Sequence, residues 1–312
     1  MDNLILSFNV IFPLFVTMAL GYILKQLKMF DEKTLKIMNN LVFKVFLPIL
    51  LFNNIYNTNL KDSFNIKLLS FCIISVIISF LLVTLIVPII EKNNKKRGVM
   101  IQGIFRSNFV LFGLPVAISL FGEGQAGVIA ILISVVVPMF NMLSVIALEI
   151  FRGGSINIKK IIKGIITNPL IIASALGLSM LLLNIKFPIF ITKSISDISK
   201  IATPLSLILL GGSFNFCDIK THIKQTSICV LGKLILLPII MIPIGIYLGF
   251  RNIELVGIML IFASPTAVSS FTMAQKMDGD DDLAAQIVVF TSAFCITTVF
   301  LWIFILKQFS FI

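Results

Sequence analysis

Two prolines interrupt long apolar runs of this sequence in nearly the same local context. Pro115 stands in FGLPVAIS and Pro265 stands in FASPTAVS, 150 residues later. A proline inside a helix removes one backbone donor and clashes with the carbonyl four residues earlier. The N-terminal end of a broken helix carries free N–H groups and partial positive charge, which together favour an anion. The residues that we expect to bind a ligand at these two breaks are Asn108, Gly113, Leu114, Pro115, Ser264, Pro265 and Thr266. The alternative is that the prolines only kink packed helices, as is common in membrane spans.

Three cations lie inside apolar runs, namely Lys44, Arg106 and Lys233. A charge near the centre of a bilayer costs at least ~2.5–3.5 kcal/mol on insertion scales, so each of them indicates a function. Lys44 and Asn40 are four residues apart and share one helix face, which adds both to the predicted site. Lys233 is expected to extend toward the membrane surface or to pair with a structural partner.

Arg106 precedes Asn108 by two residues, so on a helix the two side chains are expected to point in different directions. We expect Arg106 to pair with Glu149, near the end of the following apolar run. Asn141 is another deep polar residue, and its simplest role is a hydrogen bond between helices. Arg106, Lys233, Asn141 and Glu149 are therefore candidates for charge balance or coupling.

Acidic and metal-binding side chains are missing from the apolar runs. None of these runs has a deep Asp, Glu or His, which cation-coupled carriers usually need. The single histidine and the four scattered cysteines form no metal or catalytic pattern, so we expect no metal, no cofactor and no enzyme. Cations and amides without acids favour an anionic ligand.

Composition places these residues in a membrane. The chain of 312 residues is 58% hydrophobic and 12% charged, whereas soluble proteins are about 25% charged. The continuous apolar runs predict an all-α integral membrane protein with membrane lipid as its partner. The net charge of +11 reflects loop cations beside lipid headgroups and not a nucleic-acid partner. We expect ten spans, at 3–25, 36–56, 65–90, 98–121, 125–150, 161–184, 187–214, 226–249, 253–275 and 283–307.

Cations in the loops predict the orientation. Of the 25 lysines and arginines, 15 fall in loops on one side of the ten spans, 7 on the other side and 3 within spans. Because the richer side faces the cytoplasm, both termini are expected outside the cytoplasmic membrane.

Ten spans divide into two halves, at residues 1–150 and 161–312. Pro115 and Pro265 occupy the fourth and ninth spans, and Pro48 and Pro204 the second and seventh, 156 residues apart. Interrupted spans at matching positions of two inverted repeats are typical of secondary transporters and lie at the binding site. We therefore predict two inverted five-helix repeats.

Several segments together resemble the auxin efflux carrier family, which includes the plant PIN carriers and many bacterial permeases. The segment from Asn108 to Pro115, N-x-x-x-x-G-x-P, is similar to the family's fourth helix. The other similar segments, which extend the resemblance over essentially the whole chain, are NNLVFKVFLPILLFNNI, NPLIIASALG, TPLSLILLGGSF and ASPTAVSSFTMAQKMDGDDDLAAQIVVFTS.

The resemblance implies a scaffold of helices 1, 2, 6 and 7 and a transport domain of helices 3–5 and 8–10. In this arrangement helices 4 and 9 cross at their prolines, the domain moves like an elevator, and homodimers form through the scaffold. It also implies that Asn108 helps to hold a substrate carboxylate. The central loop of about ten residues is short, as in the bacterial members, so regulatory phosphorylation there is not implied.

Together these features predict a permease that exports a small mono- or dicarboxylate by uniport from a bacterial cytoplasm. A sodium- or proton-coupled symporter of organic anions is the alternative, which the lack of deep carboxylates disfavours. An intramembrane enzyme would need a base beside Ser264 or its neighbours, and a channel would not need broken repeats.

Overall fold

The protein is described by a computed structural model that covers residues 2–57, 65–122, 126–152, 158–214 and 219–312. These residues form helices and loops, and none of them lies in a strand. The helices are α1 (Asp2–Gln26), α2 (Glu32–Leu41), η1 (Val42–Phe46), α3 (Leu47–Tyr56), α4 (Ile66–Ile90), α5 (Asn94–Phe105), α6 (Phe109–Phe121), α7 (Ala126–Phe151), α8 (Ile158–Ile166), α9 (Pro169–Leu182), α10 (Ile189–Ser199), α11 (Ala202–Ser213), α12 (Ile219–Leu231), η4 (Gly232–Leu236), α13 (Leu237–Tyr247), α14 (Asn252–Ala263), α15 (Ser269–Lys276) and α16 (Asp281–Gln308).

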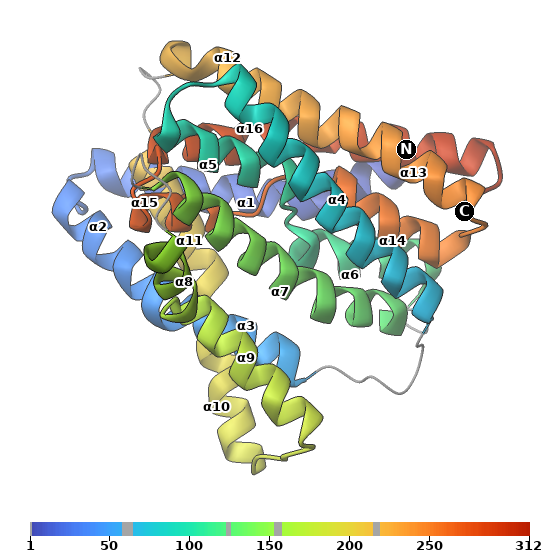
Figure 1. The fold of residues 1–312 in the computed structure, drawn as a ribbon, viewed down its shortest axis with the longest axis horizontal. Helices are drawn as coiled ribbons and strands as arrows, with labels where there is room; N and C mark the ends of the chain where they lie inside the picture. Colours follow the sequence, from blue (N-terminus) through green and yellow to red (C-terminus); the bar gives the residue numbers. More distant parts are fainter. Residues whose placement is uncertain (1, 58–64, 123–125, 153–157, 215–218) are drawn as a thin grey trace.

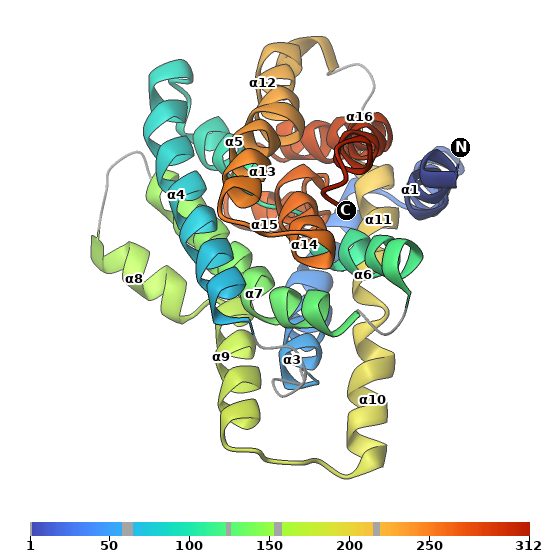
Figure 2. The ribbon, with the colours of Figure 1, turned by 90° about the vertical axis from the view of Figure 1, so that its right-hand side faces the viewer.

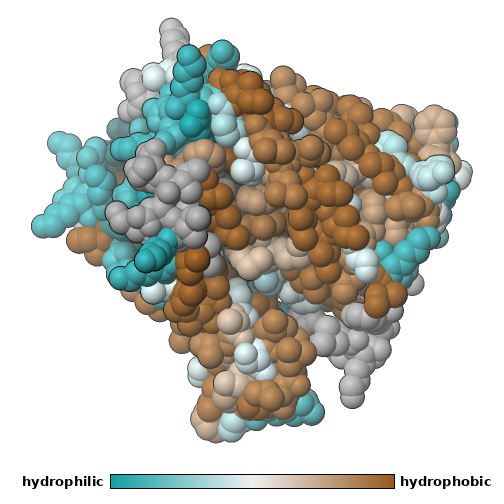
Figure 3. Space-filling model, in the orientation of Figure 1, coloured by the Kyte–Doolittle hydropathy of each residue, from teal (hydrophilic) through white to brown (hydrophobic). Residues whose placement is uncertain are grey.

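An all-helical structure follows from the composition, because a chain in lipid must satisfy its backbone hydrogen bonds internally. In the described residues, six helices or continuous helical stretches are long and apolar enough to cross a membrane. Figure 3 shows a broad hydrophobic face with hydrophilic residues gathered toward the ends of the molecule. The chain termini lie at one end, opposite α2 and α15 (Figure 1). These helices indicate a multi-pass membrane protein, whereas the count of ten spans stays a prediction.

One group of helices, which we name the α1 group, comprises α1, α2, α3, α9, α10 and α11. Helices α1 and α11 pack so closely that a Cβ atom added to Gly21 would clash with the carbonyl of Ile208. A Cβ atom added to Gly211 would clash in the same way with the carbonyl of Met18. Helices α3, α9 and α10 pack together and project from the body of the molecule (Figures 1 and 2).

A second group of helices, which we name the α14 group, comprises α4 to α7 and α12 to α16. Helix α14 packs against α13, α6 and α7, and its hydrophobic residues are buried throughout. Helix α5 packs against α4 and α7 and is buried from Gly98 to Phe105. Short helices such as α5 and α14 can lie this deep because neighbouring helices cover them on all sides.

Two π-helical turns widen the helices just before a proline. In η1 the N–H of Leu47 donates to the carbonyl of Val42, and in η4 the N–H of Leu237 donates to that of Gly232. Pro48 and Pro238 follow, at the second position of α3 and α13. A proline would otherwise clash with the carbonyl four residues earlier, and an i→i+5 turn relieves this contact.

The predicted sixth span, 161–184, is wrong at its start. Asn168 caps α9 by accepting a hydrogen bond from the N–H of Leu170 at 2.9 Å, and Pro169 is the first residue of that helix. Helix α8 is therefore a separate helix. Its sequence IKKIIKGII combines three lysines with isoleucines at helical spacing, which is the amphipathic pattern of an interfacial helix. The division at 1–150 and 161–312 and the inverted relation of the halves stay predictions.

Candidate functional site

The first interruption of a buried helix lies between α5 and α6, at Arg106, Ser107 and Asn108. Arg106 ends α5 in an extended conformation, with φ −79° and ψ 141°. The prediction that the break falls at Gly113–Pro115 is wrong, because α6 runs helically through these residues. Their side chains lie outside the described ones. Three successive polar residues in an apolar run mark the break more accurately than the proline does.

The second interruption lies between α14 and α15, from Ser264 to Val268, and contains Pro265. A residue that precedes a proline is disfavoured in a helix, and Ser264 accordingly adopts φ −69° and ψ 155°. The predicted position of this break is therefore correct.

The two breaks bond to each other directly, and we name the place where they meet the crossing. The N–H of Asn108 donates to the carbonyl of Pro265 at 2.8 Å. The hydroxyl of Thr266 donates to the carbonyl of Gly103, near the end of α5, at 2.7 Å. From α5, the amide of Gln102 donates to the carbonyl of Ser270 at 3.0 Å. Backbone groups released by each break are thus satisfied by the other, as a low-dielectric interior requires.

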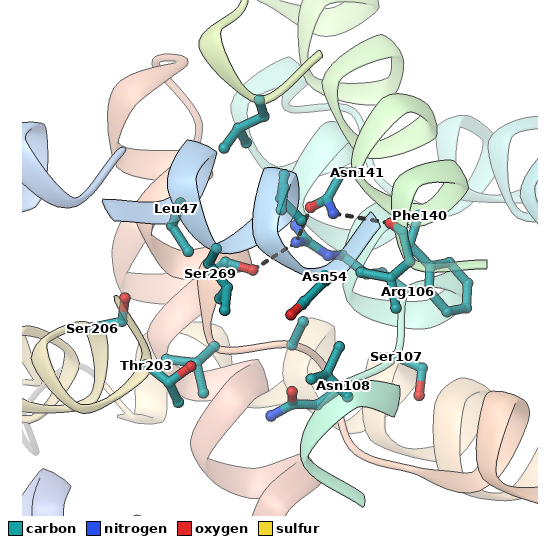
Figure 4. A pocket seen from close by; sticks show the side chains of 17 residues that line it. Leu47, Asn54, Arg106, Ser107, Asn108, Phe140, Asn141, Thr203, Ser206 and Ser269 are labelled. Atoms are coloured by element: carbon teal, nitrogen blue, oxygen red, sulfur yellow. Dashed lines mark hydrogen bonds between the residues drawn. The ribbon is translucent and has the colours of Figure 1, made fainter. Parts of the chain in front are cut away.

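A cavity of about 70 Å³ lies beside the crossing, between the breaks and the α1 group. Figure 4 shows Arg106 and Asn108 on one side of this space and Leu47, Thr203 and Ser206 on the other, and Ser269, beside Leu47 in this view, bonds to the guanidinium of Arg106. Its lining consists of one guanidinium, several amides and hydroxyls, and a set of apolar side chains. The lining residues that belong to the α1 group are Leu47, Leu50, Leu51, Asn54, Leu170, Thr203 and Ser206.

Arg106 is the charged residue of the cavity lining, and only 3% of it is exposed. Its Nη2 donates to Asn141 Oδ1 at 2.5 Å and to Ser269 Oγ at 2.6 Å. Its Nη1 lies 2.7 Å from the sulfur of Met273, and its Nε has no hydrogen-bond partner. Throughout the described residues, no carboxylate forms an ion pair with Arg106. A buried cation is thus held in place by neutral groups only.

Asn108 is the second polar group of the first break that faces the cavity. It is 8% exposed, and its Nδ2 has no hydrogen-bond partner. The expectation that Arg106 and Asn108 point in different directions is wrong, because both line the cavity. The reason is that an extended segment places residues two apart on the same side, whereas a helix does not. One side of the cavity therefore offers donors and a positive charge.

The predicted ion pair between Arg106 and Glu149 is also wrong. Glu149 pairs with Arg152 at 2.8 Å, and Arg152 also reaches Asp278 at 2.8 Å. Asn141 bonds to Arg106 and donates to the carbonyl of Val137 at 2.9 Å, so it positions the guanidinium.

Lys233 is fully buried, and its Nζ lies 3.4 Å from the carbonyl of Ile261 in α14. Of the two expectations for Lys233, extension to the membrane surface is therefore wrong, and the carbonyl of Ile261 is its structural partner; Lys233 does not line the cavity. The ammonium instead lies at the C-terminal end of α14, where the helix dipole favours a cation.

Other predicted residues lie away from the cavity. Ser264 and Thr266 are fully buried in the crossing and do not line the cavity. Asn40 and Lys44 do not line the cavity either: Asn40 lies in α2 and Lys44 in the π-helical turn η1, before Leu47, the first residue of this stretch that lines it. The predicted site thus combined residues that the fold separates.

Lys44 belongs instead to a group of lysines near the α2–α15 contact. Partial burial lowers the pKa of Lys276, and the like charges of Lys44 and Lys36 lower it further. Beside them, the amide of Asn39 donates to Gln275 at 2.6 Å, which joins α2 to α15. The three lysines therefore lie close enough for their like charges to act on one another.

Sequence reasoning missed Asn54, Thr203, Ser206 and Ser269, which supply polar groups to the cavity. No local sequence pattern marks these four residues, so only the spatial arrangement distinguishes them from packing residues. Among the described residues, no three His, Cys, Asp or Glu side chains gather as they would around a metal ion.

Comparison with known proteins identifies the family. A family model described as "Membrane transport protein" matches residues 6–303. The chain belongs to this family. The match confirms the resemblance to the auxin efflux carrier family. An uncharacterized transporter of Methanocaldococcus jannaschii is 22% identical over 96% of this chain and 98% of its own length. A second uncharacterized transporter, from Methanothermobacter thermautotrophicus, is 24% identical over 95% of this chain and 97% of its own length.

Proposed function

We propose that this membrane transport protein is a secondary transporter that carries a small organic anion, and that the anion binds at Arg106 beside the crossed breaks. The observation that supports the proposal most strongly is the buried guanidinium of Arg106, which faces a cavity without a carboxylate partner in the described chain. Unpaired buried ions are costly, so a site of this kind is completed by an ion of opposite charge. A carboxylate suits the site because its oxygen can accept a charge-assisted hydrogen bond from the Nε–H of Arg106, which has no partner in the described chain.

Asn108 adds to the attraction for an anion. Its free Nδ2 group faces the cavity, so it can donate to a carboxylate oxygen that Arg106 also binds. The break places this side chain at the start of α6, and the N-terminal end of a helix favours negative charge. The guanidinium, the amide and the helix end therefore act on the same ligand group.

The position of the cavity suggests how such a ligand would cross the membrane. The breaks and α7 supply one part of its wall, and α3, α9 and α11 of the α1 group supply the other. Movement of the α14 group against the α1 group would carry Arg106 and Asn108 past a stationary wall. We infer alternating access by an elevator-type motion, with the α1 group as the scaffold and as the surface for a homodimer.

Energetics favour export of an anion without a coupling ion. With a cytoplasmic side that is negative, exit is favourable by about 2.3 kcal/mol per charge for each 100 mV. We therefore propose uniport of a mono- or dicarboxylate from a bacterial cytoplasm, with both chain termini outside. A sodium- or proton-coupled symporter is the rival outcome of the test that follows.

Transport currents test the proposal. The purified protein is reconstituted in liposomes on a solid-supported membrane and receives lactate, succinate, choline or methylammonium, with and without sodium. For at least one carboxylate we expect a current that corresponds to the entry of negative charge into the liposomes and that sodium does not change. We expect no current for the cations. Currents for the cations alone would contradict an anion site, and currents that require sodium would indicate the symporter.

A further inference from the structure

We infer, on the basis of the proposed function, that the site takes a short monocarboxylate and excludes dicarboxylates. Three properties of the cavity carry this inference: its size, its single positive charge and the apolar wall that faces this charge.

The cavity in this structure has the size of a ligand of a few atoms. Its volume is about 70 Å³, and roughly 10–15 Å³ of such volume holds one water molecule. The space therefore accommodates about five to seven atoms of the size of water. Propionate and lactate have about that many non-hydrogen atoms, whereas succinate, malate and citrate have more.

The charge of the lining matches one carboxylate. Arg106 is the cation among the described lining residues, and the polar residues around it are neutral: Asn54, Ser107, Asn108, Asn141, Thr203, Ser206 and Ser269. One bound carboxylate neutralises the guanidinium. A second carboxylate in the same space would remain without a counter-charge, which a buried site penalises strongly.

The wall opposite the guanidinium suits a short hydrocarbon body. Leu47 and Leu51 on α3 and Leu170 on α9 line the cavity and are buried. A second carboxylate would lie against these leucines. Short apolar chains, by contrast, gain about 25 cal/mol for each Å² that they remove from water there. The hydroxyls of Thr203 and Ser206 leave room for one further neutral polar group on the ligand.

Thermal unfolding of the purified protein with propionate, lactate, succinate and malate tests the inference. We expect both monocarboxylates to raise the melting temperature and to bind at least tenfold more tightly than either dicarboxylate. Tighter binding of succinate or malate would overturn the inference and leave the anion site intact. If no carboxylate bound while methylammonium did, the proposed function itself would fail.

A variant that adds a second cation to the cavity tests the charge argument separately from the size argument. Leu50 lines the cavity and is only partly buried, so Leu50→Lys introduces an ammonium with limited damage to the fold. We expect this variant to bind succinate at least tenfold more tightly than the wild type does. Leu50→Met is the matched control and should keep the wild-type preference. An unchanged preference in a folded Leu50→Lys protein would overturn the inference.

Discussion

The two helix breaks have the same overall design but supply different groups to the cavity. The first break presents Arg106 and Asn108, whose polar atoms face the cavity. The second buries its polar residues, Ser264 and Thr266, in the crossing and presents Ala267 and Val268 to the cavity. In the proposed function, the first break therefore provides the binding groups, and the second provides the support that holds the first in place.

This difference shows that matching sequence motifs need not have matching functions. Both breaks leave backbone groups that must be satisfied inside the protein. Thr266 satisfies the carbonyl of Gly103, and the carbonyl of Pro265 accepts from the N–H of Asn108. Because the second break provides these bonds, the first can leave polar side chains free for a ligand.

Arg106→Gln should have the largest effect on binding. The substitution removes the positive charge from the cavity, so carboxylate affinity should fall at least ~100-fold, in line with the cost of an unpaired buried charge. Ligand-induced changes in melting temperature measure the loss. Arg251→Gln, which changes an arginine that bonds to main-chain carbonyls outside the cavity, should bind normally. Binding by Arg106→Gln within tenfold of the wild type would refute the role of the first break.

Thr266→Val should affect stability and leave affinity nearly unchanged. Loss of the hydroxyl leaves the buried carbonyl of Gly103 without this donor, which costs about 1–3 kcal/mol. Thermal unfolding without ligand measures the change. Thr84→Val is the matched control, because the buried hydroxyl of Thr84 has no hydrogen-bond partner. Equal melting temperatures for the two variants would show that the second break does not support the crossing.

Asn108→Ala should weaken binding by about tenfold, the value of one hydrogen bond of ~1–1.5 kcal/mol. The backbone bond from Asn108 to Pro265 does not involve the side chain, so the fold should persist. Ser264→Ala in the second break is the control and should leave affinity unchanged, because that hydroxyl faces no ligand. Titration of a monocarboxylate followed by calorimetry compares the two. Equal losses of affinity would remove the distinction between the breaks.

Pro115→Ala should have the smallest effect and should change affinity by less than about twofold. Helix α6 begins at Phe109 and continues through this position, so the proline does not create the break. Calorimetry of the variant with a monocarboxylate provides the measurement. A loss of more than tenfold would mean that Pro115 shapes the site after all.

The sequence correctly predicted the all-helical membrane class, the family and one of the two breaks, whereas the ten spans and the inverted repeats stay predictions. Pro265 marks its break accurately because a proline disfavours a helical conformation in the residue before it. Pro115 misled because α6 begins at Phe109 and continues through this proline, as membrane helices can when neighbouring groups satisfy the freed backbone. The sequence Arg106–Ser107–Asn108 was the accurate signal.

The residues that line the cavity were harder to predict. The assumption of helical spacing separated Arg106 from Asn108, although an extended segment brings them together. The same assumption placed Lys44 in the site, because a π-helical turn cannot be read from periodicity. Thr203 and Ser206 reach the cavity through packing of α11 that no local pattern encodes.

The most direct test is an experimental structure of the protein with lactate bound in sodium-free buffer. The account predicts density for one carboxylate within hydrogen-bonding distance of the Arg106 guanidinium and the Asn108 amide. The body of the ligand should lie toward Leu47 and Leu51. Density for the anion away from Arg106, or a carboxylate side chain of the protein paired with that guanidinium, would contradict the account.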